Sequence, residues 1–170
     1  MEALETAHQK IQSELAEDLL NEVKKTTPTF FEKMVLGLLD KMGYGGYLEG
    51  SGEHTGKSGD EGIDCRIKED RLGLDVIYVQ AKKWEGTVGR PEIHKFVGAL
   101  KGQGANKGIF LTTSSFSCEA LDYASKIDSP KIVLIDGITL AQLMIDYDVG
   151  VSKVKNFEIK RKDTDFFVED

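Results

Sequence analysis

The hydrophobic positions of this 170-residue chain recur at helical spacing in several separate segments. Residues 4–25 place apolar side chains near helical spacing among Glu, Gln and Lys, which predicts an amphipathic helix appended to the main domain. A stronger apolar stripe predicts a second helix that begins at Pro28 or Thr29 and ends at Gly43. Further helical patterns cover residues 91–100, 118–127 and 138–147.

Strand-like patterns occupy the segments between these predicted helices. Residues 62–68 and 75–82 alternate apolar and polar side chains and are joined by a turn through 69–73, which predicts a hairpin. Residues 108–113 and 131–135 are short and almost wholly apolar, which is typical of strands buried on both faces. The order helix, hairpin, helix, strand, helix, strand, helix predicts an α/β fold in which α-helices flank a central mixed β-sheet.

One main domain is expected, over residues 27–150. Residues 1–26 form the N-terminal helix or a linker, and residues 151–170 form a charged tail that the pattern does not place. Residues 43–62 hold eight glycines and show no apolar periodicity, so they predict a long loop. Long loops in compact domains are often functional.

The composition is that of an ordinary globular protein, with 40% hydrophobic and 30% charged residues. No apolar run approaches the roughly 20 residues of a membrane helix, and the N-terminus lacks the apolar core of a signal peptide. We therefore expect a cytoplasmic protein without a membrane partner. The two cysteines have neither a disulfide framework nor a zinc-ligand spacing.

The net charge of −7 argues against a nucleic-acid partner, because phosphate contacts come mainly from Lys and Arg. The charge is unevenly distributed, however. Residues 71–107 carry seven basic and three acidic side chains, whereas both flanking regions are acidic. On charge alone this basic segment is either a solvated helix face or a surface for phosphates.

Three polar side chains converge on the predicted hairpin. Alternation along the first strand places Ile63 and Cys65 on one face and Asp64 on the other. In the second strand the same alternation leaves Gln80 and Lys82 two residues apart on one face. If the strands pair, Asp64, Gln80 and Lys82 meet on one side of the sheet.

Phosphodiester hydrolysis is the chemistry that suits this set of side chains. Magnesium prefers oxygen ligands, keeps several waters and bridges a protein carboxylate to a substrate phosphate. Asp64 would supply the carboxylate, Gln80 a weaker amide oxygen, and Ala81 a backbone carbonyl. Lys82 is charged at neutral pH and would position the attacking water and stabilise developing charge.

Each of these residues also has an ordinary structural interpretation. An Asp on a strand is usually a turn or surface residue, and a Gln-x-Lys pair is usually the exposed face of a strand. The segment Thr29–Glu32 fits a capping box, in which Glu32 would close the start of a helix. His54 and His94 lack a partner at metal-ligand spacing. Trp84 could stack on a base, although a half-buried aromatic is commoner.

Taken together, these motifs resemble the PD-(D/E)XK nuclease superfamily and, more narrowly, the catalytic domain of Mrr-type restriction endonucleases. The resemblance runs from about Thr27 to about Gly150. Each motif is short, but their order and spacing are specific. The matching segments are Pro28–Glu32, Met42–Tyr44, Gly59–Asp64, Tyr78–Lys82, Val88–Pro91, Phe96–Leu100, Leu111–Ser114 and Leu134–Gly137.

The resemblance implies a restriction-endonuclease-like fold and an endonuclease that cuts double-stranded DNA with Mg²⁺, or with Mn²⁺ as a substitute. It also implies a role in restricting foreign, often methylated, DNA. Asp64 would be the principal metal ligand, Gln80 would replace the usual acidic residue, Lys82 would be the catalytic lysine and Glu32 an auxiliary acid. Gln80 agrees with the Mrr branch, and the smaller number of anionic ligands favours one tightly held metal. Glu61 departs from the glycine common in this branch.

The resemblance also bears on partners. Mrr-type proteins commonly carry a winged-helix recognition domain ahead of the nuclease domain, and we expect that domain to be missing from this chain or supplied by a partner. Cutting both strands suggests a homodimer, at least transiently. The basic segment is now better interpreted as a DNA surface. Its candidate contacts are Lys83, Trp84, Arg90, Lys95 and Lys101.

Two other hypotheses come from different functional classes. The first is a DNA-binding or structural module that keeps the nuclease fold but does not cleave, although the intact set of Asp64, Gln80 and Lys82 argues against it. The second is a nucleotide-binding α/β domain, suggested by the glycine-rich loop before a strand. That loop contains neither GxGxxG nor GxxxxGK[ST] and precedes a strand instead of a helix, which argues against this hypothesis.

Overall fold

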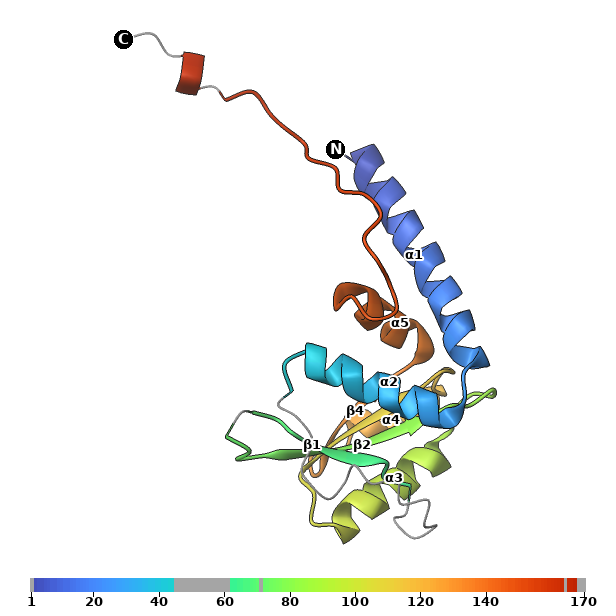
Figure 1. Cartoon of the computed structure of the whole chain (residues 1–170). Coiled ribbons are helices and arrows are strands. Elements are labelled where there is room, and N and C mark those ends of the chain that lie inside the picture. Colours follow the sequence, from blue (N-terminus) through green and yellow to red (C-terminus); the bar gives the residue numbers. More distant parts are fainter. Residues whose placement is uncertain (1, 45–61, 71, 164, 168–170) are drawn as a thin grey trace.

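The computed structural model describes residues 2–44, 62–70, 72–163 and 165–167 (Figure 1). The predicted order of one hairpin followed by alternating helices and strands is confirmed. The elements are, in order, α1 (Glu2–Lys25), α2 (Pro28–Lys41), β1 (Cys65–Lys68), β2 (Val76–Lys82), α3 (Arg90–Gly102), β3 (Lys107–Thr112), α4 (Cys118–Ser125), β4 (Lys131–Ile135), α5 (Gly137–Asp146) and the short 3-10 helix η1 (Asp165–Phe167).

The four strands form one mixed sheet in the order β1-β2-β3-β4. β1 runs antiparallel to β2, with Cys65 opposite Val79. β2, β3 and β4 are parallel to one another, and Lys82 at the end of β2 lies opposite Thr112 at the end of β3. The helical connections between the parallel strands place α3 and α4 on one side of the sheet, as crossover helices require.

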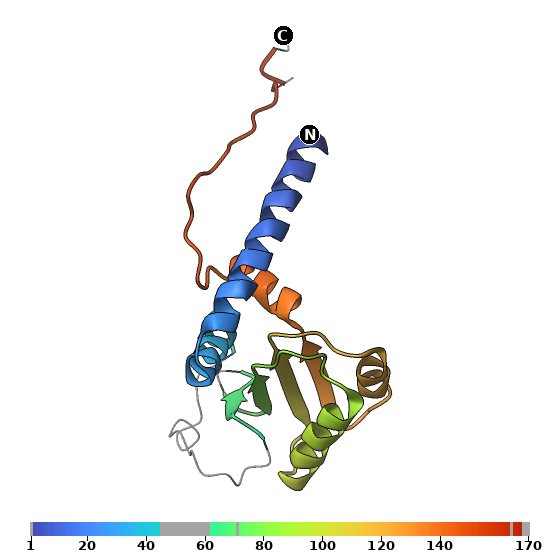
Figure 2. The ribbon, with the colours of Figure 1, turned by 90° about the vertical axis from the view of Figure 1, so that its right-hand side faces the viewer.

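Each face of the sheet carries its own hydrophobic core. On one face, α2 and α5 contribute Phe31 and Leu140, which pack with Val79 of β2. On the other face, α3 contributes Phe96, whose ring meets Phe110 of β3 edge-on at 5.5 Å between centroids. Figures 1 and 2 show the sheet between α2 and α3. Burial of each such side chain contributes roughly 1.5–3 kcal/mol, so the sheet is packed on both faces.

Helix α2 begins at Pro28, as predicted, but the capping interpretation was wrong. The N-cap is Thr27, whose side-chain oxygen accepts a hydrogen bond from the Phe30 amide at 3.2 Å. Proline suits the first helical position because its fixed φ is already helical, and it holds the preceding residue in extended conformation. Glu32 therefore lies beyond the cap, and its carboxylate does not close the helix.

Helix α1 is less separate from the domain than its sequence suggests. Its second half buries Ala16, Leu20 and Val23, and it packs against α5, where Ala141 is buried. Its first half projects from the body of the protein (Figures 1 and 2), and Leu4 and Ile11 are exposed. In the part of the chain that the structure describes, no helix has the length and apolar character to cross a membrane.

The two short apolar strands differ in burial. β3 is buried on both faces from Gly108 to Thr112, as predicted. The same prediction was wrong for β4, because β4 forms an edge of the sheet and leaves Lys131 and Val133 exposed. Whether a strand lies at the edge depends on the order of strands in the sheet, and the residues of β4 alone do not indicate that order.

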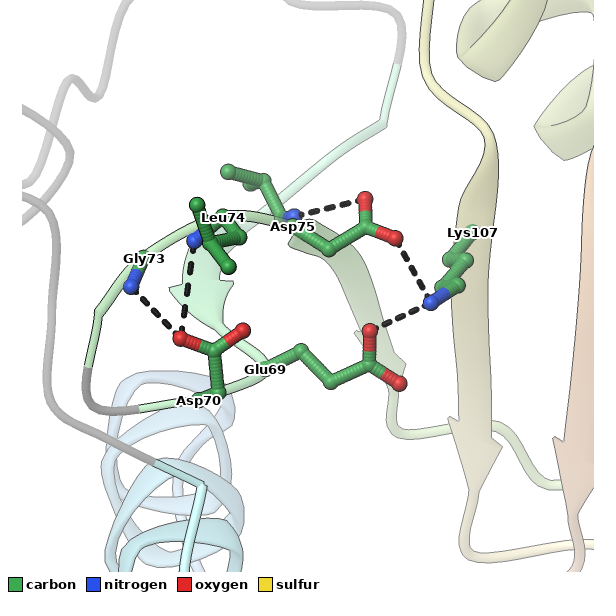
Figure 3. Close-up of polar contacts among 7 residues, drawn as sticks. Glu69, Asp70, Gly73, Leu74, Asp75 and Lys107 are labelled. Carbon is green, nitrogen blue, oxygen red and sulfur yellow. Dashed lines mark hydrogen bonds and ion pairs between the residues drawn. The ribbon is translucent and has the colours of Figure 1, made fainter.

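The turn of the β1–β2 hairpin is fixed by two sets of polar contacts (Figure 3). An oxygen of the Asp70 carboxylate accepts hydrogen bonds from the amides of Leu72 and Gly73, both at 2.7 Å. The Lys107 ammonium at the start of β3 contacts Glu69 and lies 2.7 Å from the Asp75 carboxylate. This contact holds the pKa of Asp75 below its usual range and ties the hairpin to the central strand.

Two further segments were predicted from the sequence, the glycine-rich loop and the charged tail. Of the glycine-rich loop, the stretch 45–61 lies outside the described residues, including Glu53, His54 and Glu61. Residues 152–163 contain no helix or strand and are exposed, and they extend away from the sheet beside α1 (Figure 1).

Candidate active site

Asp64 lies immediately before β1 and is tied to β2 at two points. Its backbone amide donates to the Val79 carbonyl at 2.9 Å, and its carboxylate oxygen Oδ2 accepts from the Ala81 amide at 2.5 Å. The pairing of β1 with β2 therefore carries the Asp64 carboxylate to the end of β2. This is the end at which the polar side chains Gln80 and Lys82 were predicted.

One detail of the predicted alternation was wrong. Ile63 does not share a face with Cys65: it packs against the core beneath α3 and α4, whereas Cys65 belongs to the core beneath α2 and α5. Regular alternation holds only within a strand, and β1 begins at Cys65. Asp64 stands at the junction, where its carboxylate reaches the backbone of β2.

The electrostatic surroundings of Asp64 favour its neutral form. The residue is exposed to solvent, but partial desolvation by the protein around its carboxylate raises the pKa to about 6. The hydrogen bond from Ala81 and the charge of Lys82 lower this pKa, whereas the charge of Glu32 raises it further. The charges of Glu32 and Lys82 thus act on Asp64 in opposite directions, and the like charge of Glu32 disfavours the ionised form of Asp64.

The buried thiol of Cys65 supports this description of the charges. Burial, followed by the charges of Asp64 and Glu32, raises the pKa of Cys65 to about 12. The thiol is therefore neutral and unreactive at physiological pH. The charge of Glu32 raises the pKa of both Asp64 and Cys65, which places Glu32 of α2 close to the start of β1.

Gln80 lies over the backbone that leads to Asp64. Gly62 has a φ of +90°, and a Cβ atom placed on it would stand only 2.8 Å from Nε2 of Gln80. The backbone conformation favours glycine here, and any side chain at this position would also have to displace the Gln80 amide. Gln80 is half-buried on the face of β2 that also carries Tyr78 and Lys82.

Lys82 contacts two groups that sequence reasoning did not connect with it. Its ammonium nitrogen Nζ lies 2.5 Å from Oε2 of Glu92 and 4.3 Å from the centroid of the Trp84 ring. Glu92 is in the first turn of α3 and also pairs with Lys95 at 2.9 Å. The only sequence signal for Glu92 was an acidic residue at the start of the helix that follows the strand with Gln80 and Lys82.

The loop between Lys82 and α3 is anchored to the segment after β3. Oγ1 of the buried Thr113 bonds both the amide and the carbonyl of Trp84 at 3.1 Å. Further along, the Val88 amide donates to the Ser115 carbonyl at 2.8 Å. These bonds turn the chain back, so that the first turn of α3 faces the end of β2.

The predicted DNA-contacting residues lie in different surroundings. Lys83 donates to the carbonyl of Thr26 just after α1, on the face of β2 opposite Lys82. Arg90 stacks over the ring of Tyr123 at 4.9 Å from the ring centroid, and Lys95 and Lys101 are exposed on α3. Trp84 is partly exposed beside Lys82. Glu92 thus pairs with both Lys82 and Lys95, and Trp84 lies against Lys82. Lys83 instead contacts Thr26.

The oxygen-rich donor set suits a hard divalent cation. Among the described residues there is no cluster of three or more His, Cys, Asp and Glu side chains arranged to hold a metal. Asp64, Glu32 and Gln80 nevertheless carry oxygen ligands, and Ala81 has a backbone carbonyl on the same strand. Magnesium is commonly held by one or two carboxylates together with water and substrate phosphate. The residues present fit that pattern.

Comparison with known families agrees with this arrangement. Residues 23–144 match the model of the Mrr_cat family, which is described as a restriction endonuclease. The chain belongs to this restriction endonuclease family. A relative from Escherichia coli strain K12, the "Type IV methyl-directed restriction enzyme EcoKMrr", is 42% identical over 164 residues. That match takes in 96% of this chain but 53% of the relative, so the chain spans about half of the relative's length.

Solved structures of two restriction endonucleases share the fold of this Mrr-family chain. A complex of the MspJI restriction endonuclease with a 27-mer oligonucleotide matches with a TM-score of 0.52 and 25% identity, over 78% of this chain and 31% of the other. The "DNA modification-dependent restriction endonuclease AspBHI" matches with a TM-score of 0.57 and 18% identity, over 82% and 36% of the respective chains. At that identity the second match shows the fold alone.

Proposed function

We propose that this chain is the catalytic part of a Mg²⁺-dependent endonuclease that hydrolyses DNA phosphodiester bonds, with Mn²⁺ as a substitute. The observation that carries the proposal is the position of the Asp64 carboxylate, bonded to the Ala81 amide at 2.5 Å and close to both Glu32 and Lys82. A structural aspartate would gain from a neutral or cationic neighbourhood. Here desolvation and, to a smaller extent, the charge of Glu32 raise the pKa of Asp64, an arrangement that a bound cation would relieve.

Each residue of the proposed site has its own role in metal binding or catalysis. Asp64 is the principal metal ligand, with Gln80 and the Ala81 carbonyl as further oxygen ligands and Glu32 as an auxiliary acid from α2. When bound, the metal supplies charge neutralisation at the phosphate and acidifies a bound water. Lys82 orients the attacking water and stabilises the charge that develops on the phosphate oxygens. With Gln80 in place of an acidic residue, one metal ion is favoured over two.

The substrate is double-stranded DNA, met by the surface around the start of α3. Trp84, Arg90 and Lys95 are exposed around this surface and provide phosphate and stacking contacts. Lys101 is exposed in the last turn of α3 and extends the surface along the helix, and Lys83 joins them if its bond to Thr26 opens. The relative named for methyl-directed restriction supports a role in restricting modified DNA. Because the chain spans about half of that relative, recognition of the modification is assigned to a domain or partner outside residues 1–170.

We further propose that residues 27–150 form the nuclease domain and that two copies act together on the two strands. Because one site cuts one strand at a time, cutting both strands needs either two sites or two visits by one site. If two copies act together, the rate at which nicked plasmid is converted to the linear form should rise more steeply than in proportion to protein concentration. A strictly linear dependence would favour independent visits by single copies.

Plasmid cleavage tests the proposed function. With Mg²⁺ or Mn²⁺, at low salt and high enzyme concentration, the purified chain should nick or cut supercoiled plasmid. Asp64→Ala and Lys82→Ala should each abolish cutting while the thermal melt stays cooperative. Lys126→Ala is the matched control, since Lys126 is an exposed lysine at the end of α4 that pairs with Asp122 of the same helix at 2.7 Å. Cutting that survives both Asp64→Ala and Lys82→Ala would refute the site, and DNA binding without any cutting would favour a non-cleaving module.

A further inference from the structure

We infer that Glu92 is a positioning residue for the catalytic lysine: its carboxylate holds the Lys82 ammonium in the site from the first turn of α3. This inference rests on the proposed function. Neither the sequence motifs nor the family resemblance gave Glu92 a role. The observation behind the inference is the 2.5 Å contact between Lys82 Nζ and Glu92 Oε2.

The Lys82–Glu92 pair is the most enclosed of the ion pairs found among the described residues. The side chains of Lys82 and Glu92 retain 26% and 22% of their exposure, whereas pairs such as Lys10–Glu14 retain 66% or more. Exposed pairs contribute little, because solvent screens them and the long side chains lose entropy when they are fixed. An enclosed, short pair restricts the lysine to one geometry, which is what a catalytic ammonium needs.

The position of Glu92 is fixed by the protein and not by the lysine alone. The adjacent Ile93 is fully buried in the core, and Phe96 and Val97 anchor the same helix. An anion in the first turn of α3 is also favoured by the helix dipole. The hydrogen bonds from Lys82 and then Lys95 lower the pKa of Glu92, so its carboxylate stays ionised at neutral pH.

Lys82 is held from three directions. Glu92 binds the ammonium, the ring of Trp84 lies beneath it at 4.3 Å, and Asp64 lies close enough for the Lys82 charge to lower its pKa. A lysine has four rotatable side-chain bonds and samples many rotamers when unrestrained. Without Glu92, the remaining contacts would leave the ammonium less precisely placed with respect to the phosphate.

The test uses the full 170-residue chain with Glu92→Gln, Glu92→Asp and, as a matched control, Glu69→Gln. Glu69 also pairs with a partly enclosed lysine, Lys107, but at the opposite end of the sheet (Figure 3). Glu92→Gln should lower kcat for plasmid nicking by about 10- to 100-fold, with KM for DNA within about twofold of wild type. Glu92→Asp, which keeps the charge, should recover part of the loss, and Glu69→Gln should leave kcat unchanged.

A second readout does not depend on cutting. Trp84 is the single tryptophan in the chain and lies against the Lys82 ammonium, so its fluorescence emission reports the position of that charge. Glu92→Gln should shift the emission in the same direction as Lys82→Met, and the double variant should match Lys82→Met alone. Glu69→Gln should leave the emission unchanged.

The two readouts separate failure of the inference from failure of the proposed function. A wild-type chain that does not cut under any condition would refute the proposed function, and the emission spectra would still decide whether Glu92 holds Lys82. Unchanged or faster cutting by Glu92→Gln, or emission identical to wild type, would overturn the inference. A joint loss of kcat, DNA affinity and thermal stability that Glu92→Asp does not lessen would also overturn it, because that pattern is expected of a purely structural residue.

Discussion

The raised pKa of Asp64 predicts that metal binding by this chain weakens steeply below neutral pH. A carboxylate must lose its proton before it can bind a divalent cation, so protons compete with the metal. With a pKa of about 6 for Asp64, the apparent Kd for Mn²⁺ should be about 11-fold higher at pH 5 than at pH 8. With the ordinary value of 3.8, the same comparison would give a change of only about 1.1-fold.

Isothermal titration calorimetry with Mn²⁺ across pH 5–8 measures this dependence. Asp64→Asn should abolish the binding. Glu32→Gln removes one of the charges that raise the pKa of Asp64, so the midpoint of the pH dependence should move to lower pH even if the affinity itself falls. A Kd that varies by less than about 1.5-fold between pH 5 and pH 8 would refute the reasoning, because it would place Asp64 in ordinary solvent or outside the metal site.

Two further predictions concern stability. Because the folded chain holds the Asp64 proton more tightly than the unfolded chain, the ionised carboxylate destabilises the metal-free protein above about pH 6, and the effect disappears below about pH 4. Asp64→Asn should therefore raise Tm at pH 7 by about 2–4 °C, equivalent to about 1 kcal/mol after solvent screening of this exposed group. At pH 4 the same substitution should not raise Tm. An equal rise at both pH values would contradict the prediction. Gly62→Ala should lower the free energy of unfolding in urea by about 1–2 kcal/mol and weaken Mn²⁺ binding, because it strains the φ of +90° and displaces the Gln80 amide. Gly98→Ala is the control, because a Cβ at Gly98 would meet nothing within 4 Å; its free energy of unfolding should be unchanged or higher. An equal loss of stability in both variants would show that the φ of Gly62 and its close approach to Gln80 are unimportant.

Local sequence patterns predicted much of the fold because each element carries its own signal. The hairpin, the alternating helices and strands, and the start of α2 at Pro28 all follow from periodicity and from the chemistry of Pro and Gly. The errors arose where tertiary structure decides. Val133 is exposed because β4 ends the sheet, and Leu20 is buried because α5 returns beside α1.

From the alternation of side chains, the sequence predicted only those residues of the candidate site that the pairing of β1 with β2 brings together. Asp64 directly precedes β1 and Lys82 ends the neighbouring β2, so strand pairing and the family resemblance were sufficient to associate them. Glu92 is ten residues from Lys82, and its approach depends on the bonds that fold the intervening loop onto Thr113. No periodicity encodes that path. The capping-box pattern pointed to Thr29 as the cap, but Pro28 suits the first helical position, which makes Thr27 the N-cap.

We propose above that Asp64 and the end of β2 form a divalent-metal site that serves phosphodiester hydrolysis. Anomalous diffraction from a crystal of this chain soaked in Mn²⁺ tests this site. We expect one strong peak within coordination distance of the Asp64 carboxylate and the Ala81 carbonyl, absent from crystals of Asp64→Asn. An ordered site with no peak at saturating Mn²⁺, or a peak that persists unchanged in Asp64→Asn, would contradict it.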